Sequence, residues 1–361
     1  MTIPCIALLG RKDQPTDAVD EYCRYLAAAL QVHDIQMKMH RVSWDLQGWP
    51  DALQALRLEA SNWHNTCVLV QYTALGWSTR GFPQKSLQVL EILRSADARV
   101  GIVFHDVEPY PGIRLIDYVR RFHQVCTMRR AVTLADLTIF TVPPERLSWL
   151  TATPRNAVFI PVGPNLPIQT ILHASSPQGH LRTIGVFSIT GGEAGVRETK
   201  IILSASRYAA QRLGKLRLSI FGRGAELRET ELREGFRDLP VELSVEGVVE
   251  PSRVIQKLSV CDVLLFVRGS ISSRRGSAIA GIACGLPIIA YSGSETAAPI
   301  TDAGVVLVSP NQPDDLNSAL VRVLSDTNYR MDLAARSRAA YQTYFAWAAI
   351  ADRFSALLNT R

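Results

Sequence analysis

The chain contains 361 residues, of which 47% are hydrophobic and 20% are charged, and its formal net charge is +6. This length suits two domains, and the composition is typical of a globular protein with a sizeable core. No uncharged stretch approaches the roughly 18 residues that a membrane-spanning helix needs. The positive charge favours an anionic partner. We expect no nucleic-acid partner, because the basic residues are not interleaved with aromatic side chains in a reading motif.

The cysteines are scattered, mostly within apolar runs, and none has the Cys-x-x-Cys spacing of a zinc site. This pattern indicates reduced thiols, and it predicts neither a bound metal nor a disulfide framework. The first ten residues lack a basic segment followed by a small-residue cleavage site, so we expect no signal peptide. Together these features predict a cytoplasmic protein.

Short apolar runs alternate with amphipathic segments along the first half of the chain, and the same alternation restarts after residue 180. The runs that we predict as strands are 3–10, 67–73, 99–106, 137–142, 157–163, 182–188, 215–222, 262–268, 286–292 and 303–309. Continuous apolar strands separated by helices are typical of parallel sheets that are covered on both faces. The sequence therefore predicts an α/β protein with two doubly wound, Rossmann-like domains facing a cleft.

The two halves are separated by residues 162–180, which lose the helical period and gain Pro, Gly and Ser. Such a segment is typical of a linker. We predict an N-terminal domain over residues 1–170, a second domain over 171–345 and a C-terminal helix over 346–361. Ligands of such sheets bind beyond the carboxyl ends of the strands.

Two glycine-rich loops follow predicted strands of the second half. In "TGGEAGVRETK" (190–200), Arg197 and Lys200 fall at or near the start of the next helix, where they can clamp a diphosphate. In "IFGRGAE", Gly222 and Gly224 allow backbone amides to approach a phosphate. A flexible surface loop and a plain turn remain the alternatives.

The third loop, "RGSISSRRGSAIAGIACGLP", leads from the strand at 262–268 into a helix of small residues. Gly276 and Ser277 lie in the first turn of that helix, so their amides are available to an anion. Arg274 and Arg275 add positive charge. Solvation of both arginines is the alternative, and two adjacent arginines point in different directions, so at most one of them is expected to face a ligand.

The ordered segments "IGVFS…RETK", "LSIFGRGAE", "VEGVVEPSRVIQKLSVCDVLLFV", "SAIAGIACGLPIIAYSGSE" and "AGVVLVSPNQPDDLNSAL" resemble the donor-binding half of family-four glycosyltransferases. The first-half segments "VLVQYTALGWSTRGFP", "VFHDVEP" and "VFIPVGPNLP" are similar to the acceptor domain of that family. The resemblance implies a retaining enzyme of the GT-B fold that uses a nucleotide-sugar donor and needs no metal or other cofactor. It also implies that the C-terminal helix crosses back to the N-terminal domain.

The resemblance implies roles for individual residues. Lys200 matches a lysine that binds the donor phosphate, and His105 stands where members place a histidine beside the donor sugar; these two form the expected catalytic set. For His105, a partnership with Asp106 or a capping role is the alternative. On the acceptor side, Arg11 and Asp13 replace a glycine-rich loop, and an ordinary surface loop is the alternative.

The sequence departs from the family at its hallmark, two glutamates separated by seven residues. Aligned from Gly285-Leu286-Pro287, those positions hold Ser272 and Ala280. Ser272, Ser273 and the loop amides are then expected to replace the lost carboxylate beside the sugar. The arginine expected after Gly185 is also absent, and Arg197 is its candidate substitute.

We therefore carry three hypotheses: an active glycosyltransferase, an inactive GT-B scaffold that binds a sugar nucleotide or a protein, and a sugar-nucleotide epimerase. The expected acceptor of the first is a glycan or a lipid-linked sugar. The arginine-rich segment 114–132 further predicts a peripheral contact with the inner face of a membrane, with a solvated helix face as the alternative.

Overall fold

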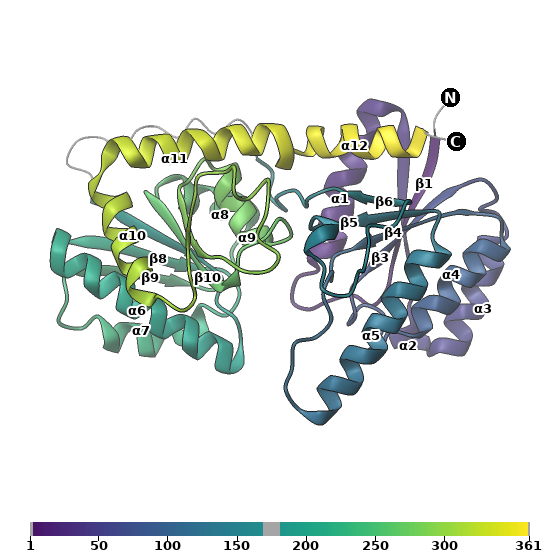
Figure 1. The fold of residues 1–361 in the computed structure, drawn as a ribbon, viewed down its shortest axis with the longest axis horizontal. Helices are drawn as coiled ribbons and strands as arrows, with labels where there is room; N and C mark the ends of the chain where they lie inside the picture. The colour runs from purple at the N-terminus through teal and green to yellow at the C-terminus, as the bar shows by residue number, and fades with distance from the viewer. Residues whose placement is uncertain (1–2, 169–180, 360–361) are drawn as a thin grey trace. The chain divides into compact units, whose positions relative to one another are not determined.

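The computed structural model describes residues 3–168 and 181–359. It divides into two compact units, unit 1 with residues 1–162 and 347–361, and unit 2 with residues 163–346 (Figure 1). Most of the linker segment expected at 162–180 lies outside the described residues. Each unit is built around a parallel sheet, which confirms the predicted α/β class with two doubly wound units.

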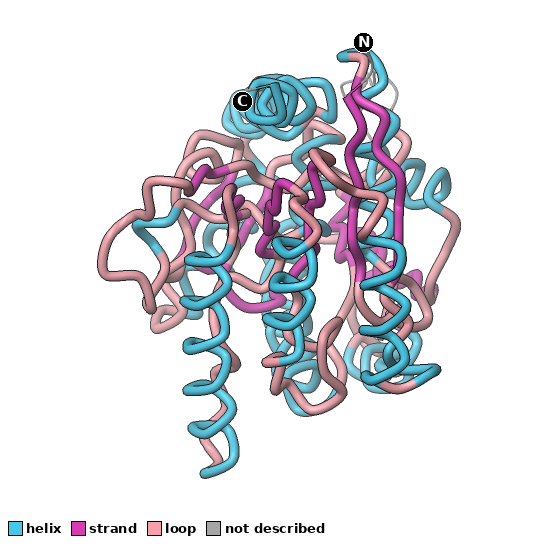
Figure 2. The backbone as a smooth tube through the Cα atoms, turned by 90° about the vertical axis from the view of Figure 1, so that its right-hand side faces the viewer, coloured by secondary structure: helices cyan, strands magenta, loops and turns pink. Residues whose placement is uncertain are grey.

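The described part of unit 1 contains a six-stranded parallel sheet in the order β2-β1-β3-β4-β5-β6. Its strands are β1 Ile3–Leu9, β2 Ile35–Arg41, β3 Cys67–Tyr72, β4 Arg99–Phe104, β5 Leu137–Phe140 and β6 Ala157–Phe159. The residues of β3 are all buried, as expected for a central strand with helices on both faces. Figure 2 shows strands with helical segments on either side of them.

The helices of unit 1 begin with α1, whose N-cap Asp17 accepts hydrogen bonds from the backbone amides of Val19 and Asp20. The helices are α1 Ala18–Leu30, α2 Trp44–Gln47, α3 Trp49–Ala60, α4 Lys85–Ser95, α5 Leu115–Leu134 and α12 Trp347–Asn359. Short 3₁₀ turns lie at Gln31–His33 and Pro144–Arg146.

The last helix, α12, packs on α1 although the two are far apart in the sequence (Figure 1). Trp347 stacks on Tyr25 with a centroid separation of 5.6 Å. Arg99 at the start of β4 donates to the carbonyl oxygens of Leu357 and Leu358 at 3.1 and 3.2 Å. Phe354 of α12 is fully buried. The C-terminal segment is therefore part of the core of unit 1.

The described part of unit 2 also contains a six-stranded parallel sheet, in the order β12-β11-β10-β7-β8-β9. Its strands are β7 Thr183–Phe187, β8 Leu216–Phe221, β9 Val241–Glu246, β10 Val263–Ser270, β11 Ile288–Tyr291 and β12 Val305–Val308. Counted from β7, this is the strand order 3-2-1-4-5-6 of dinucleotide-binding domains. The order reverses between β7 and β10.

The helices of unit 2 cover both faces of this sheet, and α6 packs against α10. They are α6 Gly192–Leu213, α7 Glu229–Gly235, α8 Pro251–Ser259, α9 Gly276–Ala283, α10 Pro313–Ser325 and α11 Thr327–Ala340. A 3₁₀ turn lies at Glu226–Arg228, and a π-helical turn at Tyr341–Phe345 follows α11.

Two strands that the sequence pattern did not predict complete the sheets. They are β2 and β9, and each lies at an edge of its sheet. In β2 buried and exposed residues alternate over Ile35–Lys38, and every residue of β9 is only half-buried. Because an edge strand is covered less than a central one, it carries polar residues and lacks a continuous apolar run.

All six tryptophans of the chain belong to unit 1: Trp44, Trp49, Trp63, Trp77, Trp149 and Trp347. Several pack against one another, as Trp44 does on Trp49 at 5.0 Å. None of the helices in the described residues is both long and apolar enough to cross a bilayer.

Candidate active site

The loops after β7, β8, β10 and β11 meet at the carboxyl edge of the sheet of unit 2, on both sides of the point where the strand order reverses. We call them the edge loops: residues 188–191, 222–224, 268–275 and 292–299. In open α/β sheets the reversal leaves a crevice at this edge, where ligands bind.

The first two edge loops pack so closely that glycine is required. Gly224 has a φ of +79°, and a Cβ atom there would lie 2.3 Å from the carbonyl oxygen of Ile189. The backbone amide of Ile189 donates to the carbonyl oxygen of Arg223 at 2.9 Å. Gly222 also has a positive φ, of +95°. The predicted Gly-x-Gly pair therefore sets the close approach of two backbone segments at this edge.

Three arginines bring positive charge to the edge loops. Arg268 ends the apolar run of β10 and is partly buried beside Glu198 and Arg223. Burial lowers the pKa of Arg268, Arg223 lowers it further and Glu198 opposes the change. Thr190 donates its backbone amide to Glu198 at 2.7 Å, which ties the start of α6 to this cluster. The arrangement concentrates cationic groups where an anion can bind.

The third arginine is Arg275, the N-cap residue of α9. A Cβ atom at Gly269 would lie 4.0 Å from its Nη2, so its guanidinium lies beside the end of β10, which carries Arg268. No side chain caps α9, and no atom lies within 4 Å of a Cβ built at Gly276. A ligand contact of the Gly276 and Ser277 amides stays a prediction.

Arg274 points to a different partner. Its Nε and Nη2 donate to the two carboxylate oxygens of Glu295 at 2.7 Å each, and the Ser272 hydroxyl donates to Oε2 at 3.0 Å. Partial burial alone would raise the pKa of Glu295, but the hydrogen bonds and charge of Arg274 hold that pKa below its usual value. Of the adjacent arginines, Arg274 thus neutralises a carboxylate. Ser273 is buried next to this pair.

One of the two cations predicted at or near the start of α6 lies elsewhere than expected. Lys200 is the ninth residue of α6, about 12 Å along the axis from its first residue. It lines a shallow hollow with Ser204 of the same helix and Asn317 of α10. Arg197 is 69% exposed and lies 3.9 Å from Glu193. The expectation that Lys200 lies near the start of the helix is therefore wrong.

Unit 1 contains a pocket of about 240 Å³ at its own reversal point, between β1 and β3. It is lined by Leu9, Gly10, Arg11, Asp13, Asp17, Ala18, Val19, Arg41, Gln71, Thr73, Leu75, Gly76 and Asp106. The lining includes Arg11 and Asp13, the residues predicted for the acceptor side. The Arg11 amide donates to the carbonyl oxygen of Gly76 at 2.8 Å and holds the loop against the neighbouring strand end.

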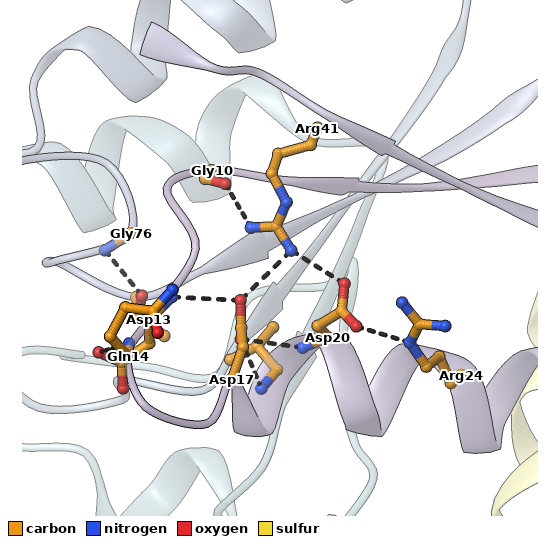
Figure 3. Close-up of polar contacts among 10 residues, drawn as sticks. Gly10, Asp13, Gln14, Asp17, Asp20, Arg24, Arg41 and Gly76 are labelled. Carbon is orange, nitrogen blue, oxygen red and sulfur yellow. Dashed lines mark hydrogen bonds and ion pairs between the residues drawn. The ribbon is translucent and has the colours of Figure 1, made fainter. Parts of the chain in front are cut away.

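One wall of this pocket is a charged network around Arg41 (Figure 3). Its guanidinium donates to the carbonyl oxygen of Gly10 at 2.7 Å, to Asp20 at 2.9 Å and to Asp17 at 3.3 Å. Burial would raise the pKa of Asp20, but hydrogen bonds from Arg24 and Arg41 lower it. Arg41 is thus neutralised by two carboxylates.

His105 follows β4 and reaches the pocket through Gln71. Its Nε2 donates to Gln71 Oε1 at 2.9 Å, and Gln71 Nε2 donates to the carbonyl oxygen of Leu69. Burial lowers the pKa of His105 to about 4, so the ring is neutral at physiological pH and carries its proton on Nε2. The ring also packs edge-on against Tyr22 at 4.9 Å. Asp106 accepts the backbone amide of Ala74 at 2.8 Å.

The sequence pattern missed four residues of these sites: Arg268, Glu295, Arg41 and Gln71. A signal existed for Arg268, because a charged residue that ends a buried strand faces the carboxyl edge of the sheet. For Glu295 and Arg41 the partners are 21 or more residues away in the sequence, so no local spacing points to them.

No protein-family model and no curated protein matches this sequence. Solved structures do match. Sucrose-phosphate synthase from Thermosynechococcus elongatus is 18% identical over 98% of each chain, with a TM-score of 0.73. HepE from Anabaena, in complex with UDP and glucose, is 16% identical over 99% of this chain and 100% of its own, with a TM-score of 0.64.

Trehalose-6-phosphate synthase, solved in work on glycosyltransfer with retention, is 13% identical over 100% of this chain and 99% of its own, with a TM-score of 0.58. At these identities the similarity establishes the fold. The chain has the GT-B fold of glycosyltransferases, as the resemblance in its sequence implied.

Proposed function

We propose that the chain is a glycosyltransferase that binds a nucleotide-sugar donor at the edge loops of unit 2. The observation that carries this proposal is the cluster of Arg223, Arg268 and Arg275 at the reversal point of the sheet. Arginine guanidinium groups and the backbone amides at a helix N-terminus both donate hydrogen bonds to phosphate oxygens. The fold shared with HepE, which was solved with UDP and glucose, supports the same donor class.

The proposed reaction is a metal-independent transfer with retention. The bond between the sugar C1 and the diphosphate oxygen breaks, and a new bond forms between C1 and a hydroxyl oxygen of the acceptor. The hydroxyl proton passes to the departing diphosphate. Fixed cations stabilise the negative charge that develops on that group. Retention is supported by the fold shared with trehalose-6-phosphate synthase, on which glycosyltransfer with retention was studied.

The proposed acceptor site is the pocket of unit 1. Arg41, a half-buried cation of this pocket, is already paired with Asp17 and Asp20, while Asp13, Gln71 and Asp106 also line the pocket. Oxygen-rich walls of this kind suit the hydroxyl groups of a glycan or of a lipid-linked sugar. His105, held neutral by burial, orients Gln71 toward this acceptor.

A thermal-shift screen tests the donor site. We expect one of the UDP-, GDP-, ADP- or dTDP-linked sugars to raise the Tm, because a ligand that binds only the folded state stabilises it by mass action. Transfer and epimerisation are then assayed with that compound. A Tm that responds to none of these nucleotides or their sugars would contradict the proposal and favour the inactive scaffold.

We further propose a peripheral membrane contact through the first turns of α5. The N-terminal end of α5 extends past the neighbouring helices of unit 1 (Figure 1). Large apolar side chains are exposed there: Tyr110 49%, Ile113 87%, Leu115 87%, Ile116 50%, Tyr118 59%, Val119 49% and Phe122 66%. Exposed Arg114 and Arg121 accompany them, and Asp117 is already paired with Arg120. Apolar side chains flanked by arginines match an anionic lipid surface.

Flotation with phosphatidylserine vesicles tests this contact. At low salt we expect the protein to float with the vesicles, and we expect the double variant Leu115→Ser/Phe122→Ser to remain in the dense fraction. Leu227→Ser is the matched control, because Leu227 is 70% exposed but lies in unit 2. A wild-type protein that does not float at low salt, or that dimerises through this face, would contradict the contact.

A further inference from the structure

The carboxylate of Glu295 lies beside the residues that precede α9, a segment that contains no acidic residue of its own. Residues 268–287, from the end of β10 to the start of β11, contain no Asp or Glu. Glu295 belongs to the next loop, after β11, and its side chain reaches Ser272 and Arg274. The segment that borders the α9 N-terminus thus receives its negative charge from elsewhere in the chain.

The two loops are joined by further hydrogen bonds, which fix where this carboxylate lies. The Thr296 hydroxyl donates to the carbonyl oxygen of Ile271 at 2.6 Å, and the Ser270 hydroxyl donates to that of Ser292 at 3.1 Å. Glu295 is only 14% exposed. A carboxylate held on a bonded framework and largely shielded from water is preorganised for a ligand hydroxyl.

The hydrogen bonds of Glu295 leave acceptor capacity. Oε2 accepts from Ser272 Oγ and Arg274 Nε, and Oε1 accepts from Arg274 Nη2. A carboxylate offers about four lone-pair sites, so Oε1 can accept one more donor. Since Arg275 also lowers the pKa of Glu295, the group is ionised and strengthens any bond from a sugar hydroxyl.

We infer that Glu295 is the carboxylate that binds a hydroxyl of the donor sugar. Arg274 and Ser272 hold it in place. The proposed diphosphate site involves other side chains, Arg223, Arg268 and Arg275, so the two halves of the donor are recognised by separate groups. This inference rests on the proposed function, because it needs a nucleotide-sugar at the edge loops.

Binding of the nucleotide-sugar identified by the thermal-shift screen is compared with binding of its nucleoside diphosphate. In Glu295→Gln we expect the affinity for the nucleotide-sugar to fall about tenfold or more, because a charged acceptor is lost. The affinity for the nucleoside diphosphate is expected to change less than about twofold. Glu242→Gln is the matched control, because Glu242 is also a carboxylate paired with cationic side chains, Lys215 and Arg217, but lies on β9.

A double variant, Ser272→Glu/Glu295→Ser, exchanges the two side chains and keeps the summed volume of the pair. We expect it to recover part of the lost affinity for the sugar, since it returns a carboxylate to the same space. If Glu295→Gln lowers the affinity for both ligands equally, Glu295 only holds the two loops together and the inference is overturned. The inference is also overturned if the affinity for neither ligand falls. If the wild-type protein binds neither ligand, the proposed function fails and this inference falls with it.

Discussion

Replacement of Arg268 by methionine is expected to lower kcat/KM for sugar transfer about a hundredfold or more. Arg268 is partly buried at the end of β10, and its charge is fixed beside Arg223 and Glu198 before any ligand arrives. A preorganised hydrogen-bond donor aimed at developing negative charge contributes a factor of about 10²–10³ in rate. We therefore expect the variant to lose stabilisation of the charge on the leaving diphosphate. Methionine keeps the length of the apolar stem. Steady-state kinetics with the donor found by thermal shift measure the effect.

Two companions make this result specific. Arg253→Met removes an exposed arginine of α8 that pairs with Glu246, and we expect kcat/KM to stay within about twofold of wild type. Lys200→Ala tests the phosphate-binding role that the sequence resemblance implies for Lys200, in place of the role that we propose for Arg268. A hundredfold loss in Lys200→Ala with little change in Arg268→Met would contradict the assignment of the cation cluster.

Replacement of Phe354 by alanine is expected to destabilise unit 1 by about 3–5 kcal/mol, the usual cost of truncating a buried phenylalanine. Phe354 lies on α12, so a change seven residues before the last one should act on the unit that contains the first strand. Urea unfolding followed by tryptophan fluorescence measures it, because all six tryptophans belong to unit 1.

Met331→Ala is the matched control for this helix variant. Met331 is 56% exposed on α11 of unit 2, and surface truncations of this kind change stability by less than about 0.5 kcal/mol. An unchanged fluorescence midpoint in Phe354→Ala, with a shift in a probe of unit 2 instead, would contradict the assignment of α12 to the core of unit 1.

The sequence predicted the strands that lie inside the two sheets and missed those at one edge of each. Inner strands such as β3 are buried throughout, so their residues form one apolar run. The edge strand β9 reads "VELSVE", with a glutamate at every fourth position and no apolar run. Its pairing with β8 depends on the neighbouring strand, which no pattern within β9 contains.

The site was harder to predict than the fold, for a related reason. Glycines and small residues mark a tight loop locally, and Gly222 and Gly224 do lie in an edge loop. Which cationic side chain faces the edge loops depends on the direction in which each side chain points, and the sequence pattern does not give that direction. Lys200 follows a glycine-rich loop in sequence, yet the helix carries it two turns away. Glu295 reaches Arg274 across 21 residues, a contact that only the folded chain creates.

The path of the chain, which passes from unit 1 to unit 2 and returns with α12, has a consequence for fragments of the protein. A fragment that ends at Val162 lacks α12, and the face of α1 that packs on it would be exposed to water. The remaining fragment would carry unit 2 together with that missing helix. The first fragment therefore lacks part of unit 1, and the second fragment contains it. The protein is thus suited to split-protein complementation, in which α12 recruits the first fragment.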